Sequence, residues 1–160
     1  MTTYSVAANP AGALHGAAFD HIGVVVKTLE KGRRSLQQTL GIIEWTTELE
    51  DPVNGVHVTF GRDPSGMVYE LLAPLDALSP VQGALQARKN LLNHVAYLVP
   101  NLGEAAARMR SAGCASTAEP RVALAYGNRM IQFFVTPLNI IVELIEAPGH
   151  KHTFFQATIP

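Results

Sequence analysis

The chain has 160 residues, of which 48% are apolar and 16% are charged, and its formal net charge at neutral pH is −1. This composition excludes a disordered chain and gives no basis for binding nucleic acid or an anionic membrane surface. No apolar run approaches the roughly 18 residues that cross a bilayer. The first residues lack the basic and continuous apolar regions of a secretion signal. With a single cysteine, Cys114, no internal disulfide is available, so we expect a cytoplasmic protein.

The first half of the chain predicts a strand, a helix and three further strands. An extension rich in alanine and glycine, 1–18, is expected to be flexible, and a strand follows at 19–26. Thr28 is the expected N-cap of a helix that ends at Gly41. Turn sequences separate the next three strands, which are expected near 43–49, 56–61 and 66–73.

The second half repeats this order of elements after a linker. A linker helix is expected at 79–90, with Ser79 as its cap. A strand follows at 92–99, and the next helix begins after Asn101 and ends at Gly113. Three more strands are expected near 115–119, 129–135 and 139–146.

The two halves match residue by residue at one offset. Aligning FDHIGVVV with LNHVAYLV places His21 over His94, and aligning VYELL with IVELI places Glu70 over Glu143, each at an offset of 73 residues (94 − 21 and 143 − 70). We therefore expect an α+β fold in which two tandem βαβββ modules form a cleft between two curled mixed β-sheets. The expected division is an extension at 1–18, a first module at 19–76, a linker at 77–91, a second module at 92–148 and a tail at 149–160.

Strand alternation places these two histidines and two glutamates on faces that otherwise carry apolar side chains. A carboxylate among Leu, Ile and Val is costly unless it is paired or binds a metal, and these strands hold no Lys or Arg. One divalent ion would neutralise two carboxylates, and mixed nitrogen and oxygen ligands suit Zn²⁺, Co²⁺, Ni²⁺, Mn²⁺ or Fe²⁺. We expect His21, Glu70, His94 and Glu143 to hold one divalent metal ion per chain (Co, Zn, Mn or Ni). The alternative is solvated glutamates at strand edges and histidines packed in the core.

Several segments, taken in order, resemble one known family. DHIGVVV, NGVHVTF, YELLAPL, NHVAYLV and GNRMIQFFVTP followed by VELIEAP resemble the vicinal oxygen chelate superfamily of glyoxalases, bleomycin resistance proteins and dioxygenases, and most closely its methylmalonyl-CoA epimerase branch. The likeness covers residues 19–148. It implies a metal-dependent isomerase that removes the proton alpha to a thioester carbonyl through a metal-stabilised enolate. It also implies an acyl-CoA or similar thioester as substrate and a homodimer. Its ligand set falls on the same two histidines and two glutamates, and Glu143 and Glu70 become the catalytic pair.

The chain departs from the epimerases at one position. An epimerase of this branch carries a glutamate, proposed as a base, on the strand that matches 56–60, where this chain has Val58. The neighbouring His57 is an alternative base, although a surface histidine is the favoured interpretation. Contacts to the phosphates of CoA are expected from basic residues, for which the candidates are Arg33, Arg34, Arg88, Lys89 and Arg129.

The sequence leaves alternatives open for the placement of the C-terminal tail and for the function of the protein. His150 and His152 are expected in a solvated tail, or in one that packs Phe154 and Phe155 on a partner subunit, in preference to a second metal site. The same ligands also suit a glyoxalase I-like lactoylglutathione lyase. A non-catalytic small-molecule-binding (drug-sequestering) module is the third possibility. Modules of that last kind usually lose ligands, whereas this chain keeps all four.

Overall fold

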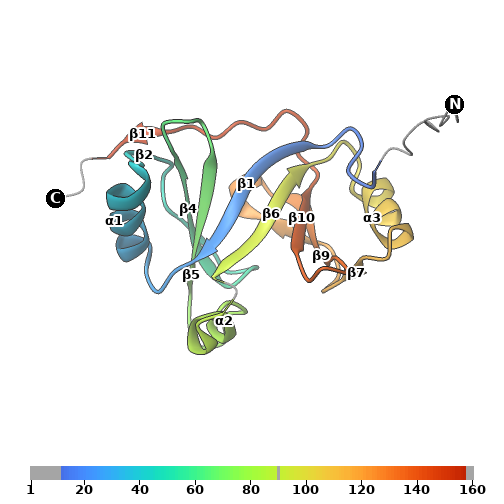
Figure 1. Ribbon diagram of the computed structural model, residues 1–160, viewed down its shortest axis with the longest axis horizontal. Helices are drawn as coiled ribbons and strands as arrows, with labels where there is room; N and C mark the ends of the chain where they lie inside the picture. The colour runs from blue at the N-terminus through green and yellow to red at the C-terminus, as the bar shows by residue number, and fades with distance from the viewer. Residues whose placement is uncertain (1–11, 90, 158–160) are drawn as a thin grey trace, which may run out of the picture.

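The computed structural model describes residues 12–89 and 91–157 (Figure 1). The strands are β1 (Ala18–Val25), β2 (Glu44–Trp45), β3 (Leu49–Asp51), β4 (Val56–Arg62), β5 (Val68–Pro74), β6 (Leu92–Leu98), β7 (Ala115–Ser116), β8 (Arg121–Ala123), β9 (Arg129–Val135), β10 (Ile141–Ile145) and β11 (Phe155–Gln156). The helices are α1 (Leu29–Leu40), α2 (Gln82–Ala87), α3 (Leu102–Ser111) and the 3₁₀ turn η1 (Leu124–Tyr126). Within the described ranges, none of the helices has the length and apolar character needed to cross a bilayer.

The strands form one continuous curled sheet (Figure 1). Its order is β11-β2-β4-β5-β1-β6-β10-β9-β7, with β3 added on β4 and β8 on β9. β1 pairs in parallel with β5, and β6 pairs in parallel with β10, while β1 and β6 run antiparallel to each other. The expected fold of two tandem modules with mixed strand directions is confirmed. The two predicted sheets are continuous because the β1–β6 ladder joins them edge to edge.

The two long helices begin where the sequence predicted. The hydroxyl of Thr28 accepts a hydrogen bond from the backbone N–H of Lys31 at 3.2 Å, and Asn101 does the same for Glu104 at 2.9 Å. These side chains satisfy backbone donors that the first helical turn leaves without a partner. Beyond α1, Gly41 adopts the left-handed conformation (φ 70°), which a residue with a side chain rarely adopts. Both predicted helix starts are confirmed.

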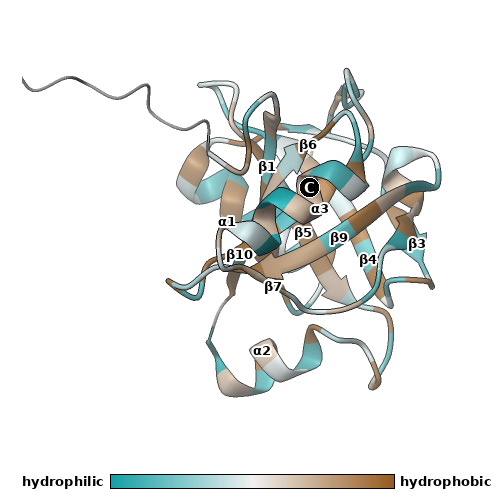
Figure 2. Cartoon of the chain, turned by 90° about the vertical axis from the view of Figure 1, so that its right-hand side faces the viewer, coloured by the Kyte–Doolittle hydropathy of each residue, from teal (hydrophilic) through white to brown (hydrophobic). Residues whose placement is uncertain are grey.

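The helices pack on the face of the sheet opposite to the predicted ligands. α1 covers a cluster that includes Trp45 and Leu71, and α3 covers one that includes Phe134 and Leu144. In Figure 2, α3 lies in front of the hydrophobic strand β9. Leu71 follows Glu70 directly, and side chains alternate along a strand, so the helix-covered face and the glutamate face are opposite faces of the same sheet.

The linker helix is shorter than predicted, and Ser79 is not its cap. α2 starts only at Gln82, and the residue at its N-cap makes no side-chain hydrogen bond to the helix. The reason lies in a preceding turn. The side chain of Asp76 accepts the N–H of Leu78, its carbonyl accepts the N–H of Ser79, and the carbonyl of Ser79 accepts the N–H of Gln82. These bonds occupy 76–82 before the helix begins. Residue 90, the predicted helix end, lies outside the described residues.

Two predicted strands differ in the structure. The first, at 43–49, is divided into β2 and β3, and between them the side-chain hydroxyl of Thr46 accepts the N–H of Phe60 of β4 at 3.0 Å. The second, at 115–119, is shortened to β7. A separate strand that was not predicted, β8, begins after Pro120, which has no N–H to donate to a ladder.

Both ends of the described chain contact the body of the protein. The prediction of a flexible extension is wrong for residues 12–17, where Leu14 and Ala17 pack against the core under α3 and Arg108 donates to the carbonyl of Ala13 at 3.1 Å. Residues 1–11 lie outside the described residues. The tail is also not detached over 149–157, because it ends in β11, which pairs with β2, although several of its side chains, such as that of Phe155, are exposed. Residues 158–160 of the predicted tail lie outside the described residues.

Candidate metal centre and its cavity

The register of four neighbouring strands brings the predicted ligands together. Across β5, β1, β6 and β10, the backbone pairs align two rows of residues: Glu70, Gly23 and His94 in one, and His21, Ala96 and Glu143 in the other. Each residue of one row has its counterpart in the other row, 73 positions away in the sequence, so the two rows are related by the internal repeat. A twofold relation between β1 and β6 therefore sets the positions of all four side chains.

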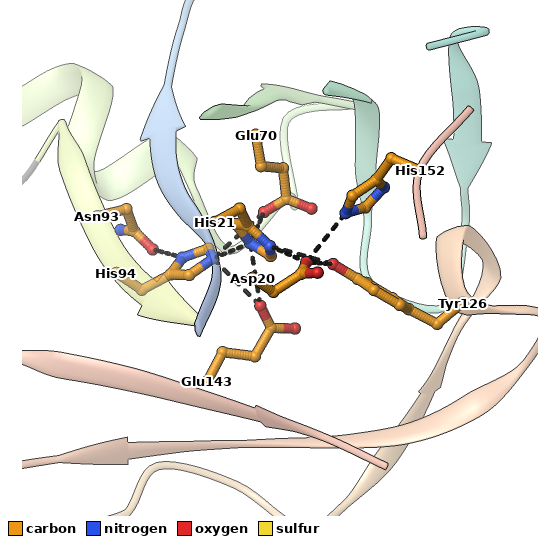
Figure 3. A network of polar contacts seen from close by, with 8 residues as sticks. All are labelled: Asp20, His21, Glu70, Asn93, His94, Tyr126, Glu143 and His152. Atoms are coloured by element: carbon orange, nitrogen blue, oxygen red, sulfur yellow. Dashed lines mark hydrogen bonds and ion pairs between the residues drawn. The ribbon is translucent and has the colours of Figure 1, made fainter. Parts of the chain in front are cut away.

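The four ligand atoms converge on one point (Figure 3). Nε2 of His21 lies 3.1 Å from Nε2 of His94. Oε2 of Glu70 lies 3.2 Å from both nitrogens, and Oε2 of Glu143 lies 3.4 Å from the first and 3.2 Å from the second. The four residues are buried, with exposed fractions of 0 to 6%. The alternative of solvated glutamates at strand edges is therefore wrong.

Both histidines are oriented by the residue that precedes them. Nδ1 of His21 lies 2.8 Å from Oδ2 of Asp20, and Nδ1 of His94 lies 3.0 Å from Oδ1 of Asn93. These oxygens accept hydrogen bonds, so each Nδ1 carries the hydrogen and each neutral imidazole directs the lone pair of Nε2 at the other ring. Two lone pairs at 3.1 Å between two carboxylates repel unless a cation or a proton lies among them.

The residues fit a divalent metal ion. Nitrogen and oxygen ligands about 2.1 Å from one ion lie roughly 3.0 Å apart at right angles and roughly 3.4 Å apart at the tetrahedral angle. The five distances given above between ligand atoms run from 3.1 to 3.4 Å. In addition, Oε2 of Glu143 is buried and makes no hydrogen bond among the described residues. An ion would satisfy this oxygen and neutralise both carboxylates.

Protons compete with a metal for this cluster. Burial opposes the charged imidazole, but the carboxylate of Glu70, with those of Asp20 and Glu143, raises the pKa of His21 well above its ordinary value. The pKa of His94 is raised in the same way, against burial, by Glu143 and Glu70. Burial acts to raise the pKa of Glu70, but the two histidines outweigh it and lower this pKa to about 2. Metal binding must therefore release protons from the imidazoles and must weaken as the pH falls.

A cavity of about 320 Å³ opens beside the cluster. Glu70, His94 and Glu143 line it, and much of the remaining wall is apolar, including Val58. His57 is absent from the lining. It lies on the opposite face of β4 because neighbouring residues of a strand alternate. The proposal of His57 as an alternative base is therefore wrong, and Val58 leaves the cavity without a carboxylate at that position.

None of the five basic residues predicted to contact CoA lines the cavity. Arg33 pairs with Glu48 at 2.6 Å, and Arg34 pairs with Glu30 at 3.1 Å. Arg121, which the sequence analysis did not single out, is the basic residue on the cavity wall, and among the described residues it makes no ion pair. No motif marks Arg121 in the sequence, because its position depends on how 117–125 folds over β9.

Comparison with known proteins identifies the family. The family model described as the Glyoxalase/Bleomycin resistance protein/Dioxygenase superfamily matches residues 20–133. The chain belongs to this superfamily. The match includes three of the four cluster residues and ends before Glu143.

Relatives within the superfamily include proteins described as epimerases. An ethylmalonyl-CoA/methylmalonyl-CoA epimerase of Cereibacter sphaeroides is 30% identical over 106 residues, which are 64% of this chain and 78% of the relative. The solved methylmalonyl-CoA epimerase of Mycobacterium tuberculosis is 27% identical, with a TM-score of 0.66 over 79% of this chain and 85% of that one. A hypothetical protein of Bacillus halodurans, 20% identical, shares the fold, with a TM-score of 0.72 over 86% of this chain and 99% of that one.

Sequence reasoning predicted the four residues that converge in the structure but missed the residues that support them. Asp20 and Asn93 occupy matching positions of the repeat, each directly before a histidine, and that signal was available in the sequence. Gly23 is a further supporting residue. A side chain there would overlap the imidazole ring of His94, so the ring fits only because position 23 has no Cβ.

We predict that the wild-type protein holds close to one divalent ion per chain and that His94→Ala loses most of it. Loss of residues that merely orient a ligand costs about 10–100-fold in metal affinity, and loss of a ligand should cost at least as much. Elemental analysis and chelator competition measure the effect, with His57→Ala as the control that removes a histidine from the opposite face of the sheet. A wild-type protein that stays metal-free after incubation with Zn²⁺, Co²⁺ and Mn²⁺ would contradict this prediction.

We also predict that Gly23→Ala weakens metal binding although Gly23 is not a ligand. The new methyl group must displace the ring of His94, which moves its Nε2 away from the other three ligand atoms. Chelator competition should show a loss of at least 10-fold, comparable with the removal of a residue that orients a ligand. Gly83→Ala is the matched control, because a Cβ at Gly83 meets no atom within 4 Å. Equal metal affinity in the two variants would mean that His94 adapts without cost.

Proposed function

We propose that this protein is a metal-dependent isomerase that inverts the carbon alpha to the carbonyl of an acyl-CoA thioester, as in methylmalonyl-CoA. One observation carries the proposal: Glu70 and Glu143, from opposite halves of the sheet, line the same cavity beside two converging histidines. Inversion needs one group on each face of the reacting carbon, and two carboxylates from opposite halves can supply both. The epimerase relatives support this choice within the superfamily.

The cluster would hold the ion through His21, His94 and the two glutamates. When bound, a divalent ion supplies the positive charge that stabilises negative charge developing on the thioester oxygen. The protein's own part is orientation. Asp20 and Asn93 fix the two imidazole rings, and the apolar wall around Val58 keeps water away from the reacting carbon, which strengthens electrostatic interactions there.

In this proposal the two glutamates, Glu143 and Glu70, transfer the protons. On one face the bond between carbon and hydrogen breaks, and the proton moves to a carboxylate oxygen of Glu143. On the other face a new bond forms with a proton that Glu70 relays from solvent. Glu143 then releases its proton to solvent, so the net proton count is unchanged. The wall at Val58 offers no carboxylate, and of the other two carboxylates in the lining, Asp51 and Glu119, the first already accepts hydrogen bonds from Asn54 and Leu124, so we assign both steps to the cluster.

Arg121 would serve substrate recognition. Its guanidinium is the positive charge on the cavity wall and pairs with none of the described acidic residues. An acyl-CoA with a carboxylate or phosphates offers the anionic oxygens that a guanidinium binds best.

We also expect a homodimer, which sedimentation of the purified protein would test.

We predict that Glu143→Gln separates metal binding from turnover. The amide oxygen can still coordinate a metal, but it cannot accept the proton from the alpha carbon. Turnover should therefore fall by roughly 10²–10⁴-fold, as is typical when a general base is lost, while metal content falls much less. Steady-state kinetics and elemental analysis on the same preparation measure both, and Glu50→Gln, on β3 outside the cavity, is the control. Near wild-type turnover of Glu143→Gln would leave Glu143 as a ligand only.

We predict solvent exchange at the reacting carbon. In D₂O, one epimer of methylmalonyl-CoA should acquire deuterium at the alpha carbon and become a mixture of epimers, since the returning proton comes from solvent. Mass spectrometry and chiral analysis detect the two changes. Formation of lactoylglutathione from glutathione and methylglyoxal, without exchange in the thioester, would instead assign the glyoxalase I-like reaction. Tight binding of small molecules with neither reaction would assign a binding module.

A further inference from the structure

The tail of the chain runs from the second half back to the first, where β11 lies beside β2 (Figure 1). We call residues 149–157 the C-terminal strap. Its far end is fixed in the sheet, because Phe155 of β11 pairs with Trp45 of β2 and Ala157 donates to the carbonyl of Ile43 at 3.0 Å. Between the two ends, Arg62 lies 4.7 Å over the ring of Phe154. The strap therefore has a defined path across β4.

One side chain of the strap reaches the surroundings of the ligands. The ring of His152 stacks on Phe60 with their centroids 4.1 Å apart, and its Nε2 lies 3.0 Å from Oδ2 of Asp20 (Figure 3). The side chains of Asp20 and His152 are only 6% and 7% exposed. Phe60 in turn pairs with Glu70 across β4 and β5. His152 thus contacts one residue beside each of two ligands.

Asp20 gathers hydrogen bonds from three parts of the fold. Its Oδ2 receives Nδ1–H of His21 at 2.8 Å, the hydroxyl of Tyr126 at 2.6 Å and Nε2–H of His152 at 3.0 Å. A carboxylate only accepts, so all three partners donate. These donors come from β1, η1 and the strap, and together they fix the direction of the carboxylate that orients His21.

We propose that His152 is a positioning residue that acts through Asp20 on His21 and so sets the metal affinity of the cluster. This inference rests on the proposed metal centre. Partners that orient a ligating histidine are worth about 10–100-fold in metal affinity. Without the strap, Asp20 would keep two donors and lose His152, which approaches over Phe60 of β4. Its carboxylate and the imidazole of His21 bonded to it would then be freer to turn.

The same atoms do not favour a second metal ion. Asp20, His21 and His152 each offer one ligand atom within 4.8 Å of the others. However, the atom that His21 would contribute is Nδ1, which carries a hydrogen and donates it to Asp20. A metal there would also have to displace the hydroxyl of Tyr126 from the same oxygen. The geometry instead matches a chain of hydrogen bonds that ends at the ligand.

Two substitutions separate hydrogen bonding from packing. His152→Phe keeps a ring on Phe60 but cannot donate to Asp20, whereas His152→Gln loses the ring and keeps an N–H donor. His152→Met is a second variant without a donor, in case the phenylalanine does not fit. We expect His152→Phe and His152→Met to weaken Zn²⁺ binding by roughly 10–100-fold in chelator competition. We also expect them to alter the visible absorption of the Co²⁺-loaded protein. His152→Gln should restore most of both properties, and His57→Phe should change neither.

Each outcome decides the proposal. Wild-type affinity and an unchanged Co²⁺ spectrum in His152→Phe and His152→Met would overturn it while leaving the metal centre intact. An equal loss in His152→Gln would also overturn it, because packing on Phe60 rather than donation to Asp20 would then be what matters. Two ions per wild-type chain would replace it with a second metal site. A wild-type protein that binds no ion would overturn the proposed metal centre together with this inference.

Discussion

The antiparallel ladder between β1 and β6 is the constraint on which the rest of the molecule depends. It places His21 opposite Ala96 and Gly23 opposite His94, so the two histidines meet across it. A shift of the register by one residue would turn one histidine to the helix-covered face and break the cluster. The parallel pairs on either side then fix Glu70 and Glu143 at the same level.

This arrangement concentrates unfavourable charge in the middle of a sheet. Two carboxylates and two imidazoles lie within hydrogen-bonding distance, in a region from which water is largely excluded. Isolated charges in such a place are expensive, and natural cores avoid them unless protons or metals compensate. The core under α1 and α3 provides apolar contacts on the other face, so stability does not depend on apolar packing at the cluster alone. A cation bound among the four side chains would relieve the repulsion between them.

The convergence of these four residues was predictable because the duplication left a periodic pattern in the sequence. His21 and His94, like Glu70 and Glu143, stand at one offset, and strand alternation places each on an apolar face. The helix starts at Thr28 and Asn101 follow from local hydrogen bonding, so they too were predictable. The strap was not predictable, because β11 pairs with a strand more than a hundred residues earlier and no local pattern encodes that pairing. The predicted cap at Ser79 was wrong because Asp76 organises a turn there. The strand predicted at 43–49 is divided at Thr46, and the one predicted at 115–119 is shortened to β7.

The strap has a consequence for the symmetry of the centre. Duplication alone would give two interchangeable imidazoles, but the repeat ends at 148 and the strap contacts only the side of His21. One histidine is therefore held by a carboxylate with two further donors, and the other by the amide of Asn93. An ion bound here would have chemically different surroundings on the side of His21 and on the side of His94, and so would any molecule bound to that ion. A fold built from two matching halves therefore presents two chemically different sides to whatever lies between its histidines.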